Sequence, residues 1–255
     1  MAENLASFKV FCQGGLNTSR DVLSQGETQP GSAISLINYE PAVTGGYRRI
    51  SGFSNDYGTV SGTGSVLGVC VANDVNDGIL ACRKPSSGNN YLHYWNNSTS
   101  AWVAVTTSGA PTMTGVSKVR FKRFNWGSSK VVLTDGINPA ATYDGTTYTQ
   151  ITHADAPSAP KYASIFQNHL FLSGDASENT NLYFSSPYSE TNFAAADGAG
   201  VINVGYPVVA TKAFRDALYI FGINNIKKLT GNNISNFVLE NVTDDLGCLA
   251  TDSII

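Results

Sequence analysis

Charge is the property that this sequence has least of. Charged residues make up 14% of its 255 positions, whereas an average globular protein has roughly 25%. Gly, Ser, Thr and Asn take their place. These residues favour turns or, in the case of Thr, strands, and they compete with helix formation by bonding to nearby backbone. The 16 basic and 19 acidic residues give a net charge of -3, so the overall field does not predict nucleic acid as the main ligand.

Long apolar runs and paired cysteines are also missing. No stretch approaches the roughly 18 apolar residues of a membrane span. The first residues, MAENLASFKVFCQGG, include an early acidic side chain and lack the apolar core of a signal peptide. Four cysteines, Cys12, Cys70, Cys82 and Cys248, have no C-x-x-C spacing and are too sparse for a disulfide scaffold. We therefore expect a soluble, unprocessed chain whose cysteines are small buried apolar residues.

Motifs of enzymes and ligand-binding loops are missing as well. The sequence contains no H-E-x-x-H, G-x-S-x-G or phosphate-binding loop and no metal-spaced Cys/His cluster. Segments 62–68 and 74–78 miss the dinucleotide and calcium-loop spacings, so both predict turns. His153 and Asp155 lie two positions apart in a loop, where a base and its orienting acid seldom reach the required geometry. We predict no catalytic residue, no cofactor and no metal, although the two carboxylates that a glycosidase needs stay open.

What the sequence does contain is a repeated β-strand pattern. After residue 53, short β-like runs alternate with polar turn clusters, which predicts an all-β protein of antiparallel hairpins. The pattern recurs four times, and its third strands align on Tyr94, Tyr143, Phe184 and Leu229. Their spacing of about 40 to 50 residues is typical of propeller blades with four strands each. We predict a β-propeller-like body, with a β-sandwich with long loops as the alternative.

The pattern also predicts where a strand, the short helical pieces and the packed aromatic residues lie. In the third copy we place the last strand at Phe193, and we expect short helical pieces only at 29–38 and 244–253. Aromatic residues recur beside the turns, which favours packing between blades over a single ligand site. A sugar-stacking surface at Trp95 and Trp102 is the alternative interpretation. The aromatic residues of this set are Trp95, Trp102, Tyr143, Tyr148, Tyr183, Phe184 and Phe193.

The first 53 residues differ from the rest, because they contain many turn formers and no clear hairpin. They predict an N-terminal arm, 1–53, in front of a β-domain, 54–255. A series of short motifs runs through the arm: Gly14-Gly15-Leu16-Asn17-Thr18, Asp21 and Leu23, Gly31-Ser32-Ala33, Asn38-Tyr39-Glu40, and Gly46-Tyr47-Arg48-Arg49-Ile50-Ser51-Gly52-Phe53. In this order they resemble the opening of phage virion proteins, among them the tail nozzle or hub proteins of short-tailed phages.

The resemblance covers roughly the first fifth of the chain and implies a non-enzymatic structural protein of a phage tail. Such proteins have bodies that resemble β-propellers, are commonly longer than this chain, and are found in the virion after synthesis in the bacterial host cytoplasm. The implied partners are adaptor or portal proteins, fibres and further copies in a ring. Genomic DNA would pass during ejection without specific binding, and a neutral or acidic lining would suit this, because phosphate affinity grows with each basic contact.

Within the arm, four residues are candidates for assembly contacts. Gly14 and Gly15 would let the backbone change direction sharply. Arg48 and Arg49 could form bidentate bonds to the carboxylates or carbonyl groups of a neighbour, or could simply lie on a solvated strand edge.

Two other functions stay open at this point: a head-to-tail adaptor, and a propeller-type module that binds host-surface carbohydrate or a receptor. A polysaccharide depolymerase is a third possibility that two facing carboxylates would support. The sequence stops on the apolar pair Ile254-Ile255, which looks like the beginning of another strand. Since an open blade edge leaves backbone groups unpaired, we expect further chain or a partner to complete the ring.

Overall fold

The computed structural model describes residues 14–19, 31–42, 45–52, 54, 56–75, 78–87, 90–107, 111 and 114–254. The chain forms two compact units, 1–56 and 57–255. Cys12, Asp21, Leu23, Phe53 and Ile255, which entered the sequence predictions, lie outside the described residues, as does the beginning of the helical piece expected at 29–38.

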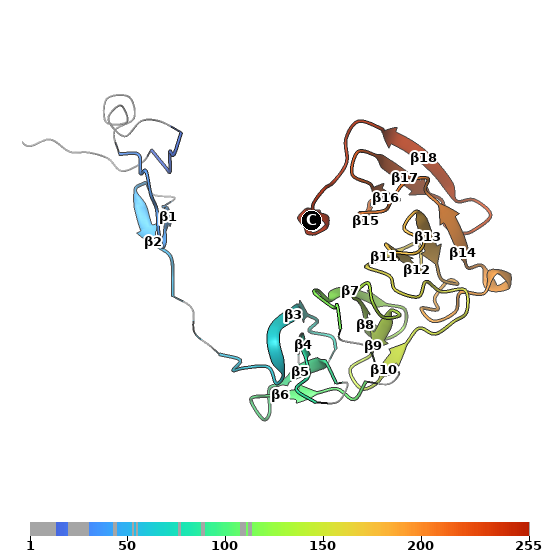
Figure 1. Ribbon diagram of the computed structural model, residues 1–255, viewed down its shortest axis with the longest axis horizontal. Helices are drawn as coiled ribbons and strands as arrows, with labels where there is room; N and C mark the ends of the chain where they lie inside the picture. Colours follow the sequence, from blue (N-terminus) through green and yellow to red (C-terminus); the bar gives the residue numbers. More distant parts are fainter. Residues whose placement is uncertain are drawn as a thin grey trace, which may run out of the picture. The chain divides into compact units, whose positions relative to one another are not determined.

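The second unit consists of four blades, each a four-stranded antiparallel sheet in which neighbouring strands follow one another along the chain (Figure 1). Blade 1 contains β3 (Thr63–Val71), β4 (Ile79–Lys84), β5 (Leu92–Asn96) and β6 (Ala101–Ala104). Blade 2 contains β7 (Arg120–Asn125), β8 (Ser129–Thr134), β9 (Ala141–Tyr143) and β10 (Tyr148–Gln150). Blade 3 contains β11 (Tyr162–Phe166), β12 (His169–Ser173), β13 (Asn181–Phe184) and β14 (Gly200–Asn203). Blade 4 contains β15 (Ala210–Phe214), β16 (Ala217–Phe221), β17 (Ile226–Thr230) and β18 (Val238–Thr243).

The first strands of successive blades lie side by side around one axis, since β7 contacts β3 and β11, and β11 contacts β15. This is the arrangement of a β-propeller, so the predicted all-β, propeller-like fold is confirmed. The repeat was aligned correctly, because Tyr94, Tyr143, Phe184 and Leu229 all fall on the third strand of their blade.

Local turn chemistry explains why the strands end where they do. Asp144 follows β9, and its carboxylate accepts hydrogen bonds from the amides of Thr146 and Thr147 at 2.8 and 2.7 Å. Gly145 between them has a φ of 99°, which a residue with a Cβ adopts only with strain. Asn96, at the end of β5, binds the amides of Ser98 and Thr99 in the same way. These side-chain-to-backbone bonds favour a tight turn over continued strand.

Apolar side chains hold the four blades together through three clusters, one at each junction between neighbours. The cluster between blades 1 and 2 includes Leu80, Leu92, Val131 and Tyr143. The other two lie between blades 2 and 3, around Val132 and Leu170, and between blades 3 and 4, around Phe171, Phe184 and Leu218. The aromatic residues at Tyr143, Tyr148, Phe184 and Phe193 are buried in these clusters, as the packing interpretation predicts.

Several sequence predictions were wrong in detail. The last strand of blade 3 is β14, while Phe193 lies in the preceding loop, where its buried ring fills the cluster between blades 2 and 3. Residues 31–38 contain no helix, and within 244–253 the only helical piece is the 3-10 turn η3 (Thr251–Ser253). A second 3-10 turn, η2, spans Ala195–Asp197. Cys82 is buried, but Cys70 and Cys248 are partly exposed. Among the described residues, no helix is long and apolar enough to cross a bilayer.

The first unit contains a hairpin that the sequence prediction did not include. Strands β1 (Tyr39–Pro41) and β2 (Tyr47–Arg49) pair antiparallel. Leu16 and Ala33 form an isolated parallel bridge, with the Asn17 amide bonded to the Ala33 carbonyl at 2.9 Å. The sequence predicts a boundary after residue 53, and the structure divides the chain three residues later, between 56 and 57.

The junction clusters predict a strong effect of cavity formation. Replacement of Phe171, which is fully buried between blades 3 and 4, by Ala is expected to lower the free energy of unfolding by about 3 to 5 kcal/mol, because a large apolar side chain leaves a cavity. Chemical denaturation of the full chain measures this. Val201→Ala on β14 is the matched control, since that side chain is 49% exposed. An equal loss in both variants would contradict the assignment of the junction core.

Candidate functional site

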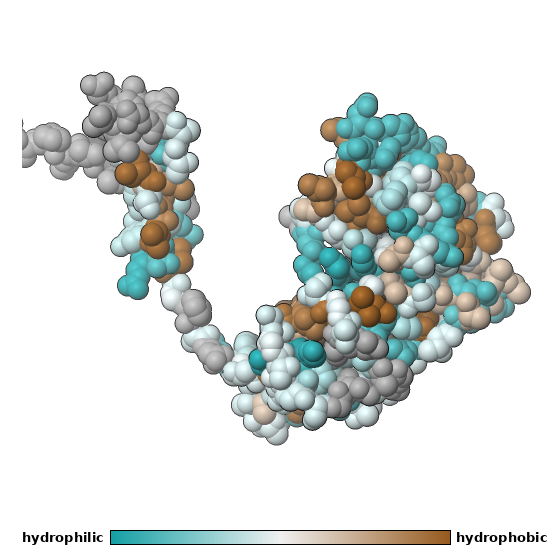
Figure 2. Space-filling model, viewed as in Figure 1, coloured by the Kyte–Doolittle hydropathy of each residue, from teal (hydrophilic) through white to brown (hydrophobic). Residues whose placement is uncertain are grey.

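The blade axis contains a hollow of about 550 Å³. Its walls come from the first strands of all four blades and from the C-terminal turn, including Thr251 and Asp252. Each first strand is at the end of its sheet and pairs on one edge only within its blade, so its other edge faces the axis. In Figure 2, hydrophilic side chains gather beside this axis. The volume is that of a small-molecule pocket, for which about 300 to 1,000 Å³ is usual.

The charged side chains that line this hollow are mainly basic. Lys118, Arg120 and Lys122 belong to the lining, and Asp252 is the acidic residue among the described lining residues. Positions 118, 120 and 122 alternate along β7 and the residues just before it, so the three side chains project to the same side of the strand. If the blade axis were the DNA conduit, its lining would not be the neutral or acidic one expected from the sequence.

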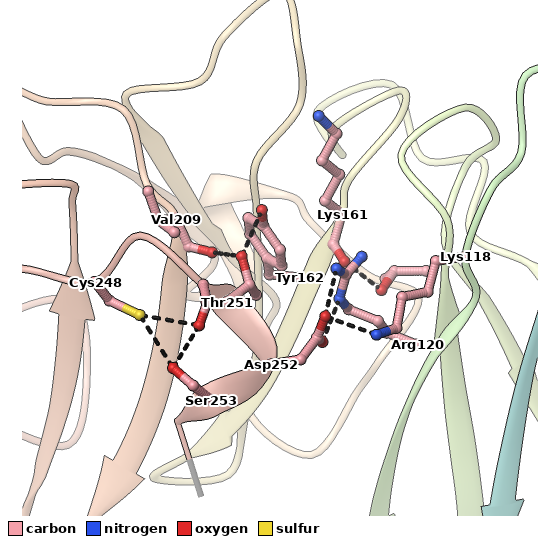
Figure 3. A network of polar contacts seen from close by, with 11 residues as sticks. Lys118, Arg120, Lys161, Tyr162, Val209, Cys248, Thr251, Asp252 and Ser253 are labelled. Carbon is pink, nitrogen blue, oxygen red and sulfur yellow. Dashed lines mark hydrogen bonds and ion pairs between the residues drawn. The ribbon is translucent and has the colours of Figure 1, made fainter. Parts of the chain in front are cut away.

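Asp252 neutralises two of these cations (Figure 3). Its Oδ2 lies 2.7 Å from Lys118 Nζ. The Arg120 guanidinium donates from Nε to Oδ1 at 3.1 Å and from its terminal nitrogen to Oδ2 at 3.2 Å. Hydrogen bonds from Lys118 and Arg120 hold the pKa of the Asp252 carboxyl below its usual value of 3.8. The contact with Arg120 is bidentate, a geometry that suits carboxylates and phosphates alike.

The C-terminal segment brings Asp252 to the axis by binding three blades. Thr251 Oγ1 donates to the Val209 carbonyl at 2.8 Å and lies 3.2 Å from the Tyr162 hydroxyl (Figure 3). The Cys248 amide donates to the Gly222 carbonyl in blade 4. At Gly247 the approach is so close that a Cβ would lie 2.3 Å from the Ile223 carbonyl oxygen. The turn therefore links blade 2 through Asp252, blade 3 through Tyr162, and blade 4 through its backbone.

The surroundings of Lys122 differ from those of Lys118 and Arg120, which project to the same side of the strand. Lys122 is partly buried, and among the described residues no carboxylate pairs with it. Burial lowers the pKa of its ammonium group, and the nearby positive charge of Lys212 on β15 lowers it further. The hollow thus contains two cations paired with Asp252 and a third, Lys122, for which no described carboxylate forms an ion pair.

None of the candidate residues from the sequence is among the residues that line this hollow, and four of them belong to the first unit. Gly14 lies so close to Ser32 that a Cβ would be 2.2 Å from the Ser32 hydroxyl oxygen. Gly15 has a φ of 70°. Arg48 binds Glu40 Oε1 across the hairpin, with both guanidinium contacts at 2.7 Å, and Arg49 is exposed. An assembly role for these residues stays a prediction.

Trp95 and Trp102 are paired across β5 and β6 in blade 1. Their ring centroids are 5.5 Å apart in an edge-to-face arrangement. The Tyr57 ring packs edge-to-face against Trp95 with 5.1 Å between the centroids, and 6% of Trp95 is exposed. This is the geometry of packed aromatic residues, and a ligand-stacking role for either indole stays a prediction.

The loop pair His153 and Asp155 is not arranged as a base with its orienting acid. His153 Nδ1 accepts a hydrogen bond from the Asp155 amide at 3.2 Å, while the Asp155 carboxylate is 3.8 Å away. Within the described part of the chain, no group of three or more His, Cys, Asp and Glu side chains is placed to hold a metal ion.

Comparisons with known proteins do not assign a family. No protein-family model matches the chain, and no curated protein matches it. Among solved structures, the chain is similar to one in "Crystal structure of BBS1N in complex with ARL6DN, soaked with lead", with 10% sequence identity and a TM-score of 0.38. The alignment covers 73% of this chain and 54% of that one. A likeness this weak carries no argument about function.

The ion pairs of Asp252 predict that the pKa of its carboxyl is lowered in the folded protein. Its carboxyl should titrate below 3.8 in an NMR experiment, and Lys118→Gln together with Arg120→Gln should move the midpoint upward. Because folding lowers the pKa of Asp252, its carboxylate stabilises the folded state fully at pH values above the unfolded-state pKa. This stabilisation is lost as the pH falls through the lower, folded-state pKa. With Asp252 half exposed, Asp252→Asn should cost only about 0.5 kcal/mol at pH 7. An unshifted midpoint would contradict the pairing.

The close approach at Gly247 predicts that Gly247→Ala loosens the C-terminal turn. The Cβ would meet backbone oxygen atoms, so the segment must move away from blade 4. Hydrogen exchange of the Cys248 amide should accelerate about tenfold or more, since this exchange reports local opening. Gly52→Ala is the control, because nothing lies within 4 Å of a Cβ built there. Unchanged exchange in Gly247→Ala would show that the turn does not depend on this contact.

Proposed function

We propose that the chain is a non-enzymatic structural component of a phage tail, a nozzle or hub protein located in the virion. The observation that carries this proposal is the way the N-terminal motifs meet. Tyr47 of the motif at residues 46–53 donates its hydroxyl toward the carbonyl groups of Gly15 and Gly31, at 2.9 and 3.0 Å. These carbonyls belong to the G-G-L-N-T and G-S-A motifs. The contact joins three of the motifs that carry the resemblance into one folded unit.

The same unit supports an assembly role through its exposed apolar side chains. Its sheet has only two strands, and an isolated two-stranded hairpin is marginally stable in water at best. Yet Ile37 is 75% exposed and Leu16 54% exposed. Ile34, Tyr39 and Ile50 are also exposed. A small unit with this surface gains stability when a neighbouring protein covers it, and we infer that an adaptor or portal protein of the virion is that neighbour.

In this proposal the blade body is a platform rather than a conduit. The axial hollow has the volume of a small-molecule pocket, which no DNA duplex could pass. Genomic DNA would instead move between copies of the chain arranged in a ring, without specific binding to any one of them. Fibres would attach to the outer parts of the blades.

The proposal predicts the position of the chain in a virus particle. A cryo-EM reconstruction of the particle that carries this chain should contain blade-shaped density in a symmetric ring on the tail axis, with the N-terminal unit against the adaptor or portal. Density on peripheral fibres, or particles without the chain, would contradict the proposal.

A matched pair of variants tests the role of the N-terminal unit separately. Ile37→Asp adds a charge to the exposed apolar surface of that unit and is expected to reduce incorporation into particles at least tenfold by mass spectrometry of purified virions, because a buried unpaired charge is costly. Val201→Asp, on β14, introduces the same change at a 49% exposed position of blade 3 and should leave incorporation unchanged. Equal incorporation of both variants would show that assembly does not depend on this surface.

A further inference from the structure

Two aromatic rings between blades 2 and 3 form a feature that the proposed tail function does not use. Trp126 lies in the turn between β7 and β8, and Tyr188 lies in the loop between β13 and β14. The Trp126 ring packs on Phe124 of the junction cluster with 4.7 Å between the centroids. The Tyr188 ring stands edge-to-face against Trp126 at 6.5 Å, and Tyr188 is 65% exposed. We call this pair the aromatic platform, because it is anchored in the core and ends in solvent.

The backbone of Tyr188 has a conformation that tyrosine rarely adopts. Its φ is 58°, in the left-handed region, where a bulky side chain is an outlier. The β11–β12 turn holds it there, since the Tyr188 amide donates to the Asn168 carbonyl at 2.8 Å. Such a conformation costs free energy, and outliers of this kind cluster at ligand-binding sites. Packing does not account for the tyrosine, because most of its surface is exposed.

The polar groups at the platform fit an uncharged ligand that has hydroxyl groups. Asn168 Nδ2 donates to the Tyr188 hydroxyl at 3.0 Å, so the hydroxyl proton of Tyr188 can be donated to a ligand. Lys130 and Glu190, next to the two rings in the chain, form an ion pair at 2.6 Å, so their charges cancel. An exposed aromatic ring beside hydroxyl and amide groups suits a sugar, which has an apolar C–H face and a rim of hydroxyl groups.

We propose that the aromatic platform of Trp126 and Tyr188 binds a neutral sugar unit of a polysaccharide. The exposed Tyr188 ring packs against the C–H face of the sugar, while its hydroxyl and the Asn168 amide bond to the sugar hydroxyls. Trp95 in blade 1 differs, because it is 6% exposed and presents little of its ring to a ligand. The platform lies on the blades, so the inference does not depend on the assignment to a phage tail.

Saturation-transfer-difference NMR of the full chain tests the proposal with the methyl glycosides of glucose, galactose, mannose, rhamnose and N-acetylglucosamine. At least one glycoside should bind saturably. Tyr188→Ala and Trp126→Ala should each weaken its binding about tenfold, because an aromatic contact accounts for about that factor. Phe214→Ala is the matched control, since Phe214 is 57% exposed and its ring also contacts one other ring, that of Tyr219 at 6.4 Å. This variant should bind as the wild type does.

Tyr188→Asn separates a binding role from a packing role. Asparagine adopts the left-handed conformation more readily than tyrosine, so the melting temperature of this variant should stay equal or rise. Its sugar binding should nevertheless fall about tenfold, as expected where a strained residue is kept for function at a cost in stability. The melting temperature also shows that a loss of binding in this variant does not reflect unfolding.

Three results would overturn the inference. The first is the absence of saturable binding of any of the glycosides to the wild-type chain. The second is an equal loss in Phe214→Ala, which would indicate general adsorption to exposed aromatic rings. The third is wild-type binding by Tyr188→Asn together with a lower melting temperature, which would show that the tyrosine serves packing.

Discussion

The structure depends on the fact that a single blade cannot bury its own surface. A four-stranded sheet with apolar side chains on both faces becomes stable only when a second sheet covers each face. In this chain three junctions cover both faces of blades 2 and 3 and one face each of blades 1 and 4, and Leu80, Val132 and Phe171 each belong to one of these shared clusters. The stacking also fixes the first strands around one axis, and their unpaired edges and charged side chains then create the hollow.

The sequence predicted those parts of the fold whose signal is local. The third strands were found because buried residues such as Tyr143 and Phe184 stand next to turn-forming residues. At β7, which reads RFKRFN, three charged side chains obscure the strand pattern, because Arg120 and Lys122 line the hollow rather than a core. Phe193 misled the assignment of β14, because an apolar residue can fill a junction from a loop. The contact of Asp252 with Arg120 has no sequence signal at all, since tertiary packing alone brings the two together.

The N-terminal unit shows a different relation between sequence and structure. Its motifs were recognised as a series, but no periodicity predicted the hairpin of β1 and β2. In the structure, motifs that are far apart in the sequence meet. The Tyr47 hydroxyl binds the carbonyl groups of Gly15 and Gly31, which lie 32 and 16 positions away. Arg48, in turn, satisfies Glu40 of its own hairpin, so its guanidinium contributes to the shape of the unit before any neighbour is present.

The C-terminal turn gives the four blades unequal resistance to mechanical force. Its hydrogen bonds and ion pairs, among the described residues, reach blades 2, 3 and 4 through Arg120, Tyr162 and Gly222. Blade 1 is held by its junction with blade 2. A pull on the chain before β3 would therefore peel blade 1 away first, while the other three blades resist as one body. The propeller is thus a stiff three-blade block with one compliant blade at its N-terminal end.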